Sequence, residues 1–246
     1  MYSYIISAML VCFSLGSCSH SVTEVTLPAE ALRVLFVGNS LTYDNDLPSA
    51  LADLALRDSM PMFTASIAKG NYALEDHWNE GEVQRALESG DWDVVVMQQG
   101  PSSLPANQAH LKRWAETFAP VIRDAGATPA LYMVWPDASR RFAFPDVDAA
   151  YANAARAVDG LLLPVGRAWT EAWRQDSELA FYSADQFHPS RLGTAFAAFV
   201  IYYGLTERMP NVRQFEVGGR TVRFTDTQVR IFREATEAVY QRPVTE

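Results

Sequence analysis

The chain has 246 residues, of which 49% are hydrophobic and 12% aromatic, and its formal net charge at pH 7 is -9. That length suits one ordinary domain with a large core, and the hydrophobic fraction argues against intrinsic disorder. The acidity argues against a nucleic-acid-binding protein, because such proteins usually carry a basic stripe.

The amino-terminal segment has the features of a secretory signal. Met1 to Cys18 contains no charged side chain, and Tyr4 to Leu15 is mostly apolar. This run is shorter than the ~20 apolar residues that a bilayer-spanning helix needs, and it matches the apolar region of a signal peptide. The segment ends in Leu-Gly-Ser-Cys, which resembles a bacterial lipobox with Cys18 as the lipidated residue.

The segment lacks the Lys or Arg that usually opens a signal, so an ordinary cleaved signal or an apolar tail is the alternative. We expect a signal peptide with lipobox over residues 1–18, a polar tether over 19–30 and one domain over 31–246. The protein would then be exported and lipid-anchored to a bacterial membrane, on the periplasmic or cell-surface side. The sequence does not indicate its oligomeric state.

The sequence predicts no metal ion and no cofactor. Its two cysteines, Cys12 and Cys18, both lie in the amino-terminal segment, so the domain has no disulfide, thiol nucleophile or cysteine metal site. No histidines are paired at ligand spacing, and neither a Gly-x-Gly-x-x-Gly motif nor a P-loop is present.

From Leu32 onward, short apolar runs alternate with amphipathic stretches. The runs indicate buried strands, which we expect at Arg33 to Val37, Met62 to Ile67, Asp93 to Met97, Pro129 to Val134 and Leu161 to Pro164. The stretches between them indicate helices at Leu47 to Arg57, Leu74 to Glu88, Ala106 to Asp124 and Pro145 to Val158. This alternation predicts an α/β fold, with a mostly parallel five-stranded sheet between two layers of helices.

The carboxyl-terminal part of the chain follows a different pattern. Pro189 to Tyr203 reads as a long buried helix, and Thr227 to Tyr240 as a final amphipathic helix. Between them, Val212 to Phe224 contains Gly218-Gly219, a two-glycine turn that predicts a small β-hairpin.

Ser40 is the first candidate for chemistry. The strand Arg33 to Val37 stops at Gly38-Asn39-Ser40, and the carboxyl end of a parallel strand is where α/β proteins place ligands. A serine on such a turn can act as a nucleophile if a base takes its proton. The alternative is an ordinary turn or capping serine.

Asp185 and His188 are the candidate acid and base. An imidazole oriented by a carboxylate is the usual base for a serine nucleophile, and Asp185-x-x-His188 offers both just before a helix. Asp185 as a mere cap and His188 as a surface residue is the alternative. His77 and His110 lie on expected helix faces and read as solvated or packed.

The candidate oxyanion donors follow two other expected strands. Gly70 follows the strand Met62 to Ile67, and a glycine there leaves its N–H open to a ligand, although a plain turn glycine is the alternative. Gln98 and Gln99 end the next strand, and alternation along a strand lets one of the two point into the site. We favour Gln98, with Gln99 as the alternate.

Taken together, these motifs resemble the SGNH (GDSL-like) hydrolases. That family has a flavodoxin-like fold and four sequence blocks: an early Ser, a Gly, an Asn and a late Asp-x-x-His. Gly38-Asn39-Ser40-Leu41-Thr42, Gly70 and Asp185-Gln186-Phe187-His188-Pro189-Ser190 resemble the first, second and fourth blocks. The resemblance implies Ser40 as nucleophile, His188 as base, Asp185 as its orienting acid, and an oxyanion hole from the Ser40 and Gly70 amides.

The third block departs from the family pattern, because Gly100-Pro101-Ser102 has no carboxamide. Some branches, among them sialate and plant-type carbohydrate esterases, use a Gln near this strand end, which Gln98 or Gln99 would supply. The resemblance implies a serine esterase that acts through an acyl-enzyme on short acyl groups of a small molecule or glycan. Trp78, Trp92 and Trp135 are candidates for sugar stacking, with core packing as the alternative.

Two other functions remain open. An acyltransferase would use the same triad on a sugar hydroxyl in place of water. A non-catalytic glycan-binding lipoprotein would keep the fold without the chemistry. No nucleic-acid partner is expected, and contact with the membrane is expected through the lipid anchor only.

Overall fold

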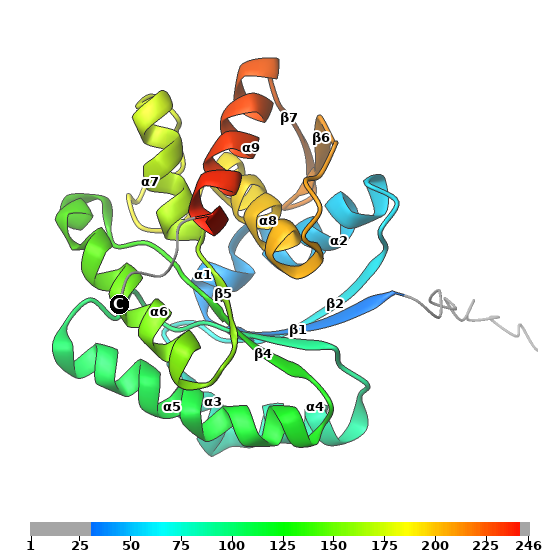
Figure 1. The fold of residues 1–246 in the computed structure, drawn as a ribbon, viewed down its shortest axis with the longest axis vertical. Coiled ribbons are helices and arrows are strands. Elements are labelled where there is room, and N and C mark those ends of the chain that lie inside the picture. Colours follow the sequence, from blue (N-terminus) through cyan, green and yellow to red (C-terminus); the bar gives the residue numbers. More distant parts are fainter. Residues whose placement is uncertain (1–30, 242–246) are drawn as a thin grey trace, which may run out of the picture.

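The computed structural model describes residues 31–241. The expected signal peptide, the tether and the lipidation site at Cys18 lie outside the described residues. A parallel sheet of five strands, in the order β2-β1-β3-β4-β5, forms the middle layer (Figure 1). Its strands are β1 (Leu32–Gly38), β2 (Met62–Ala68), β3 (Val94–Met97), β4 (Thr128–Tyr132) and β5 (Leu161–Leu163).

Helices cover both faces of the sheet and make the expected three layers (Figure 1). One layer contains α2 (Leu47–Arg57), α7 (Val165–Gln175), α8 (Arg191–Thr206) and α9 (Asp226–Gln241). The other contains α3 (Leu74–Glu80), α4 (Glu82–Ser89), α5 (Pro105–Asp124) and α6 (Phe144–Ala157). Short helical turns α1 (Ser40–Tyr43), η1 (Asp44–Asp46) and η2 (Ala138–Ala143) complete the connections.

The strand order places a switch point beside β1. Chain connectivity runs from β1 to β2 on one side, and β3 then pairs with the other side of β1. Val37 is in register with Ile67 of β2 and with Met97 of β3, so the three strands end at one level. Ligands of open α/β sheets bind outside the carboxyl ends of the strands at such a point, which is where Ser40 follows β1.

Two helices differ from the sequence prediction. The helix expected over Leu74 to Glu88 is two helices, because Gly81 takes the left-handed conformation with φ of 69° and separates α3 from α4. Helix α7 was not predicted, although Val165, Ala168 and Trp169 are buried at helical spacing.

Helix α8 also begins two residues later than expected. Its cap is Ser190, whose hydroxyl accepts the N–H of Gly193 at 3.0 Å. Pro189 therefore precedes the helix, and the segment that holds Asp185 and His188 is a loop up to Ser190.

The hairpin of β6 (Gln214–Val217) and β7 (Arg220–Arg223) confirms the two-glycine signal. Gly218 and Gly219 take φ values of 56° and 68°, as the tight turn requires. The hairpin forms a separate small sheet that packs against α2, where the N–H of Glu216 donates to Asp53 at 2.7 Å. Its turn lies close to Asn45, because a Cβ at Gly218 would be 3.2 Å from the Asn45 Cα, but the hairpin itself carries no candidate residue.

The three tryptophans considered for sugar stacking pack within the fold. Trp135 is fully buried and stacks on Trp169 with 3.7 Å between ring centroids. Trp78 packs edge-on against Phe118, and Trp92 lies over Phe63. The aromatic rings that the sequence offered for stacking therefore serve the core instead.

Within residues 31–241, no helix is both long and apolar enough to cross a membrane. The same part of the chain gathers no three His, Cys, Asp or Glu side chains in a metal-binding arrangement.

Candidate active site

The turn after β1 presents Ser40 in a fixed position. A Cβ at Gly38 would lie 2.4 Å from both the Gln98 side-chain oxygen and the Thr42 hydroxyl, so the turn closes only around a glycine. Asn39 caps α1, since its Oδ1 accepts the N–H of Leu41 at 3.1 Å. Ser40 is the half-buried first residue of α1, so its N–H has no acceptor within that helix.

Gln98 lies beneath this turn, and its side-chain amide is fully used there. Its Oε1 accepts the N–H of Asn39 at 2.9 Å and the hydroxyl of Thr42 at 2.8 Å. Its Nε2 donates to Asn39 Oδ1 at 2.9 Å and to the carbonyl of Gln99. Because both N–H groups are engaged and the side chain is fully buried, Gln98 has no donor left for an oxyanion, contrary to the preference stated from sequence.

Gln99, the alternate, lines the cleft beside Ser40. Its Nε2 donates to the Ser102 hydroxyl at 3.0 Å, which leaves its second N–H without a partner among the described residues. Tyr151 fixes its backbone, because the phenol donates to the Gln99 carbonyl at 2.6 Å and accepts the Gln99 N–H at 3.2 Å. The strand end therefore places one glutamine under the turn and the next one in the cleft.

His188 and Asp185 form a hydrogen-bonded pair. The His188 Nδ1 donates to Asp185 Oδ2 at 2.6 Å, so the neutral ring leaves Nε2 as its acceptor. The other carboxylate oxygen accepts the backbone N–H of His188 at 2.9 Å, which ties the acid to the same turn. The hydrogen bond from His188, followed by that from the Ser183 hydroxyl, holds the pKa of the Asp185 carboxyl well below its usual value.

Contacts from other segments hold this loop next to the serine turn. Asn45, just after α1, donates to the Pro189 carbonyl at 2.8 Å. Trp135 donates to the Phe187 carbonyl at 2.9 Å, and Phe187 lines the same cleft as Ser40. Residues on both sides of His188 thus touch the serine side of the site, although the structure shows no hydrogen bond between His188 and Ser40. Such bonds are often long in unliganded enzymes.

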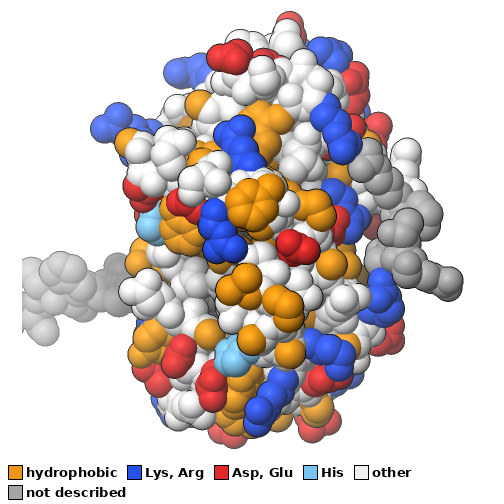
Figure 2. All heavy atoms as spheres, turned by 90° about the vertical axis from the view of Figure 1, so that its left-hand side faces the viewer, with side chains coloured by type: hydrophobic (Ala, Val, Ile, Leu, Met, Phe, Trp, Pro, Cys, Tyr) orange, Lys and Arg blue, Asp and Glu red, His pale blue; other side chains and the backbone are white. Residues whose placement is uncertain are grey.

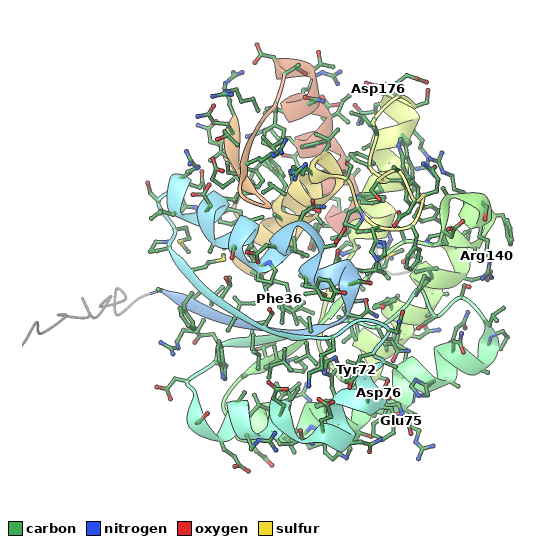
Figure 3. All side chains as sticks on the ribbon, turned by 180° about the vertical axis from the view of Figure 1, so that it is seen from behind. Phe36, Tyr72, Glu75, Asp76, Arg140 and Asp176 are labelled. Atoms are coloured by element: carbon green, nitrogen blue, oxygen red, sulfur yellow. The ribbon has the colours of Figure 1, made fainter. Side chains whose placement is uncertain are left out.

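The cleft itself measures about 400 Å³ and opens at the carboxyl ends of β1 and β3. Its lining residues are Asn39, Ser40, Asn71, Tyr72, Ala73, Gln99, Gly100, Pro101, Ser102, Asn107, His110 and Phe187. Figure 2 views this edge of the molecule, where histidine and basic side chains border exposed apolar ones. Figure 3 shows Tyr72 and Glu75 at the same end of the sheet as Arg140, beyond Phe36 of β1.

Gly70 lies in the exposed loop after β2 and is absent from the residues that line the cleft. Its N–H makes no hydrogen bond with the described residues, and a Cβ there would sit 3.2 Å from the Tyr43 hydroxyl. The next residue, Asn71, takes the left-handed conformation with φ of 64° and does line the cleft. The structure thus brings this loop to the site through Asn71, while the Gly70 N–H stays free of hydrogen bonds to the described residues.

His77 is a contributor that the sequence did not single out beyond a packed or solvated helix position. It is fully buried, and its Nε2 donates to the Gly38 carbonyl at 2.7 Å, directly before the serine turn. Its Nδ1 is buried without a partner among the described residues. Burial lowers the pKa of His77, against a smaller opposite effect of its hydrogen bond to Gly38. Its spacing from Leu74 signals burial, but its acceptor on another segment is set by the tertiary fold.

The chain is similar to several proteins of known structure. No family model and no curated protein sequence matches the chain. A putative SGNH hydrolase from Slackia heliotrinireducens is 28% identical with a TM-score of 0.61, over 71% of this chain and 99% of that one. A DUF4886 family protein from Bacteroides uniformis is 18% identical with a TM-score of 0.70, over 88% and 98%. The acetyl xylan esterase AlAXEase is 15% identical with a TM-score of 0.54, over 71% and 100%. The chain therefore has the fold of the SGNH hydrolases.

The buried imidazole makes stability depend on pH. Below pH 6.5, the ordinary pKa of histidine, the unfolded chain takes up a proton at His77, whereas the folded chain binds that proton less readily. The folded state therefore loses stability as the pH falls below 6.5. His77→Gln keeps an N–H donor for Gly38 but cannot titrate. We expect its free energy of unfolding, measured by urea denaturation, to fall less steeply than that of the wild-type protein as the pH drops below 6.5.

His77→Leu is the matched variant, because it removes both the titration and the donor. It should share the shallower slope and be about 1 kcal/mol less stable than His77→Gln at neutral pH. Slopes equal to that of the wild-type protein in both variants would contradict the assignment.

Proposed function

We propose that this chain is a serine esterase that hydrolyses a carboxylic ester through Ser40, His188 and Asp185. The observation that carries the proposal is the 2.6 Å hydrogen bond from His188 to Asp185, in a loop tied to the serine turn by Asn45. The SGNH-hydrolase fold of the chain, shared with structures described as lipase/acylhydrolase and acetyl xylan esterase, supports the same chemistry.

In the acylation step, Ser40 Oγ attacks the ester carbonyl while His188 Nε2 accepts the hydroxyl proton. Asp185 holds the ring with Nδ1 protonated and stabilises the imidazolium that forms. Because its pKa is depressed, the carboxylate stays ionised across the neutral range. The tetrahedral intermediate then collapses, the alcohol leaves with the proton from His188, and Ser40 carries the acyl group.

Deacylation reverses these roles. Water attacks the acyl-enzyme, His188 accepts its proton, and the carboxylic acid leaves as Ser40 Oγ is reprotonated. Replacement of water by a sugar hydroxyl would give the acyltransferase, which appears as product partitioning that depends on added acceptor.

The oxyanion that forms in both steps needs N–H donors aimed at it. The Ser40 N–H is open at the start of α1, and the Gly70 N–H is unengaged in the neighbouring loop. Gln99 adds a side-chain N–H from the cleft wall, in place of Gln98. In this proposal the third donor is therefore the second glutamine of the pair.

The substrate is proposed from the cleft. A volume of about 400 Å³ lined mostly by amide, hydroxyl and imidazole side chains suits a short acyl group and a polar alcohol better than a long acyl chain. We therefore propose short-chain esters of a small polyol or glycan as the substrates.

The catalytic assignment predicts the loss of turnover in two variants. Ser40→Ala and His188→Ala should lower kcat for p-nitrophenyl acetate by a factor of about 10³ or more, because the nucleophile and its base act as a unit. A fluorophosphonate probe should label Ser40 in the wild-type protein. If the folded wild-type protein forms no adduct, the esterase assignment is wrong and a non-catalytic binding protein is favoured.

Substitution of the two glutamines should affect different properties, turnover for Gln99 and stability for Gln98. Gln99→Met removes the proposed oxyanion donor and should lower kcat by about 10²-fold. Gln98→Met leaves buried groups of Asn39 and Thr42 unpaired and should cost about 2–4 kcal/mol in urea denaturation. Turnover of Gln99→Met equal to that of the wild type would remove this residue from the oxyanion hole.

The cellular location is proposed from the sequence alone. With Cys18 as the lipidated residue, the protein would be exported and anchored by lipid at the periplasmic or cell-surface side of a bacterial membrane. Cys18→Ser should then move the protein from the membrane fraction to the soluble fraction of expressing cells. Unchanged membrane retention would argue against the lipobox.

A further inference from the structure

A second imidazole–carboxylate pair borders the cleft. His110 of α5 faces the cleft, and its Nε2 lies 2.9 Å from Glu75 Oε2 at the start of α3. The two helices pack together, so the pair bridges elements of one layer. The proposed catalytic chemistry does not use either residue.

The hydrogen bond to Glu75 determines which nitrogen of the His110 ring is free to accept a hydrogen bond. A carboxylate only accepts, so Nε2 carries the hydrogen, and in the neutral ring Nδ1 is an acceptor. Nδ1 makes no hydrogen bond with the described residues, and the side chain keeps 33% of its surface exposed. An oriented acceptor is therefore available at the cleft wall.

The neighbours of His110 are polar as well. Asn107 lies one turn earlier on the same face of α5 and also lines the cleft. Asn71, Gln99 and Ser102 line the same cleft, so it offers amide and hydroxyl groups together with Ser40. Such a set of donors and acceptors matches a group with several hydroxyls, because each hydroxyl both donates and accepts.

We propose that His110, oriented by Glu75, binds a hydroxyl of the alcohol half of the substrate and so selects polyol esters. The hydroxyl donates to Nδ1, and the bond from Nε2 to Glu75 makes the ring a better acceptor. This inference rests on the proposed esterase function and adds a specificity-determining residue to it. His110 takes no part in the proton transfers at Ser40.

Two acetate esters that differ only in hydroxyl groups test the proposal. Glyceryl monoacetate carries free hydroxyls on its alcohol, and propyl acetate carries none, while the acyl group is the same. The measured quantity is the ratio of kcat/KM for the two esters. His110→Gln keeps an N–H toward Glu75, but its amide oxygen is bonded to the same carbon as that nitrogen and does not occupy the position of Nδ1. The ratio should therefore fall about tenfold, the worth of one hydrogen bond.

Two further variants test the partner of His110 and provide a control. Glu75→Gln can present an N–H to the ring and release its tautomer, so the ratio should fall by a smaller factor in the same direction. Glu116→Gln alters the Lys112–Glu116 pair on the same helix, outside the cleft, and should keep the wild-type ratio.

The outcomes are distinguishable. A ratio that falls in His110→Gln and Glu75→Gln, but not in Glu116→Gln, supports the subsite. A ratio unchanged in His110→Gln, or equal losses for both esters, overturns the subsite and leaves the esterase standing. A folded wild-type protein that hydrolyses neither ester contradicts the esterase function, and the subsite with it.

Discussion

The buried side-chain amide of Gln98 is the interaction on which the site depends. It joins the end of β3 to the turn after β1, through two bonds to Asn39 and one to Thr42. A buried amide of this kind is stabilising only when all its hydrogen bonds are made, because an unpaired donor or acceptor in the core costs about 1–3 kcal/mol. This arrangement also requires a glycine at position 38, because any side chain there would displace the Gln98 amide.

This constraint explains why the turn is held from several directions. His77 Nε2 donates to the Gly38 carbonyl, and the Lys69 N–H donates to the same oxygen at 3.1 Å. Asn39 contributes in turn by donating to the Tyr72 carbonyl at 3.0 Å, which ties the loop after β2 to the serine. The backbone around Ser40 is thereby fixed before any substrate arrives, which is the preorganisation that electrostatic catalysis requires.

The two imidazole–carboxylate pairs arise in different ways. His188 and Asp185 come from one loop and are three residues apart, so their geometry is local. His110 and Glu75 come from different helices and meet only because α3 packs on α5. In our proposals the first pair serves the proton transfers at Ser40, and the second recognises the alcohol.

The sequence by itself determined the alternation of strands and helices, the parallel sheet, and the local Asp185-x-x-His188 pair, because each depends on periodicity or on neighbouring residues. It also marked Gly38-Asn39-Ser40 as a turn at a strand end. It did not separate Gln98 from Gln99, since alternation says that one faces the site without saying which. That choice, the hydrogen bond from His77 to Gly38 and the meeting of His110 with Glu75 were decided by tertiary structure, because each partner lies on a segment distant in the chain and is placed only when the layers pack.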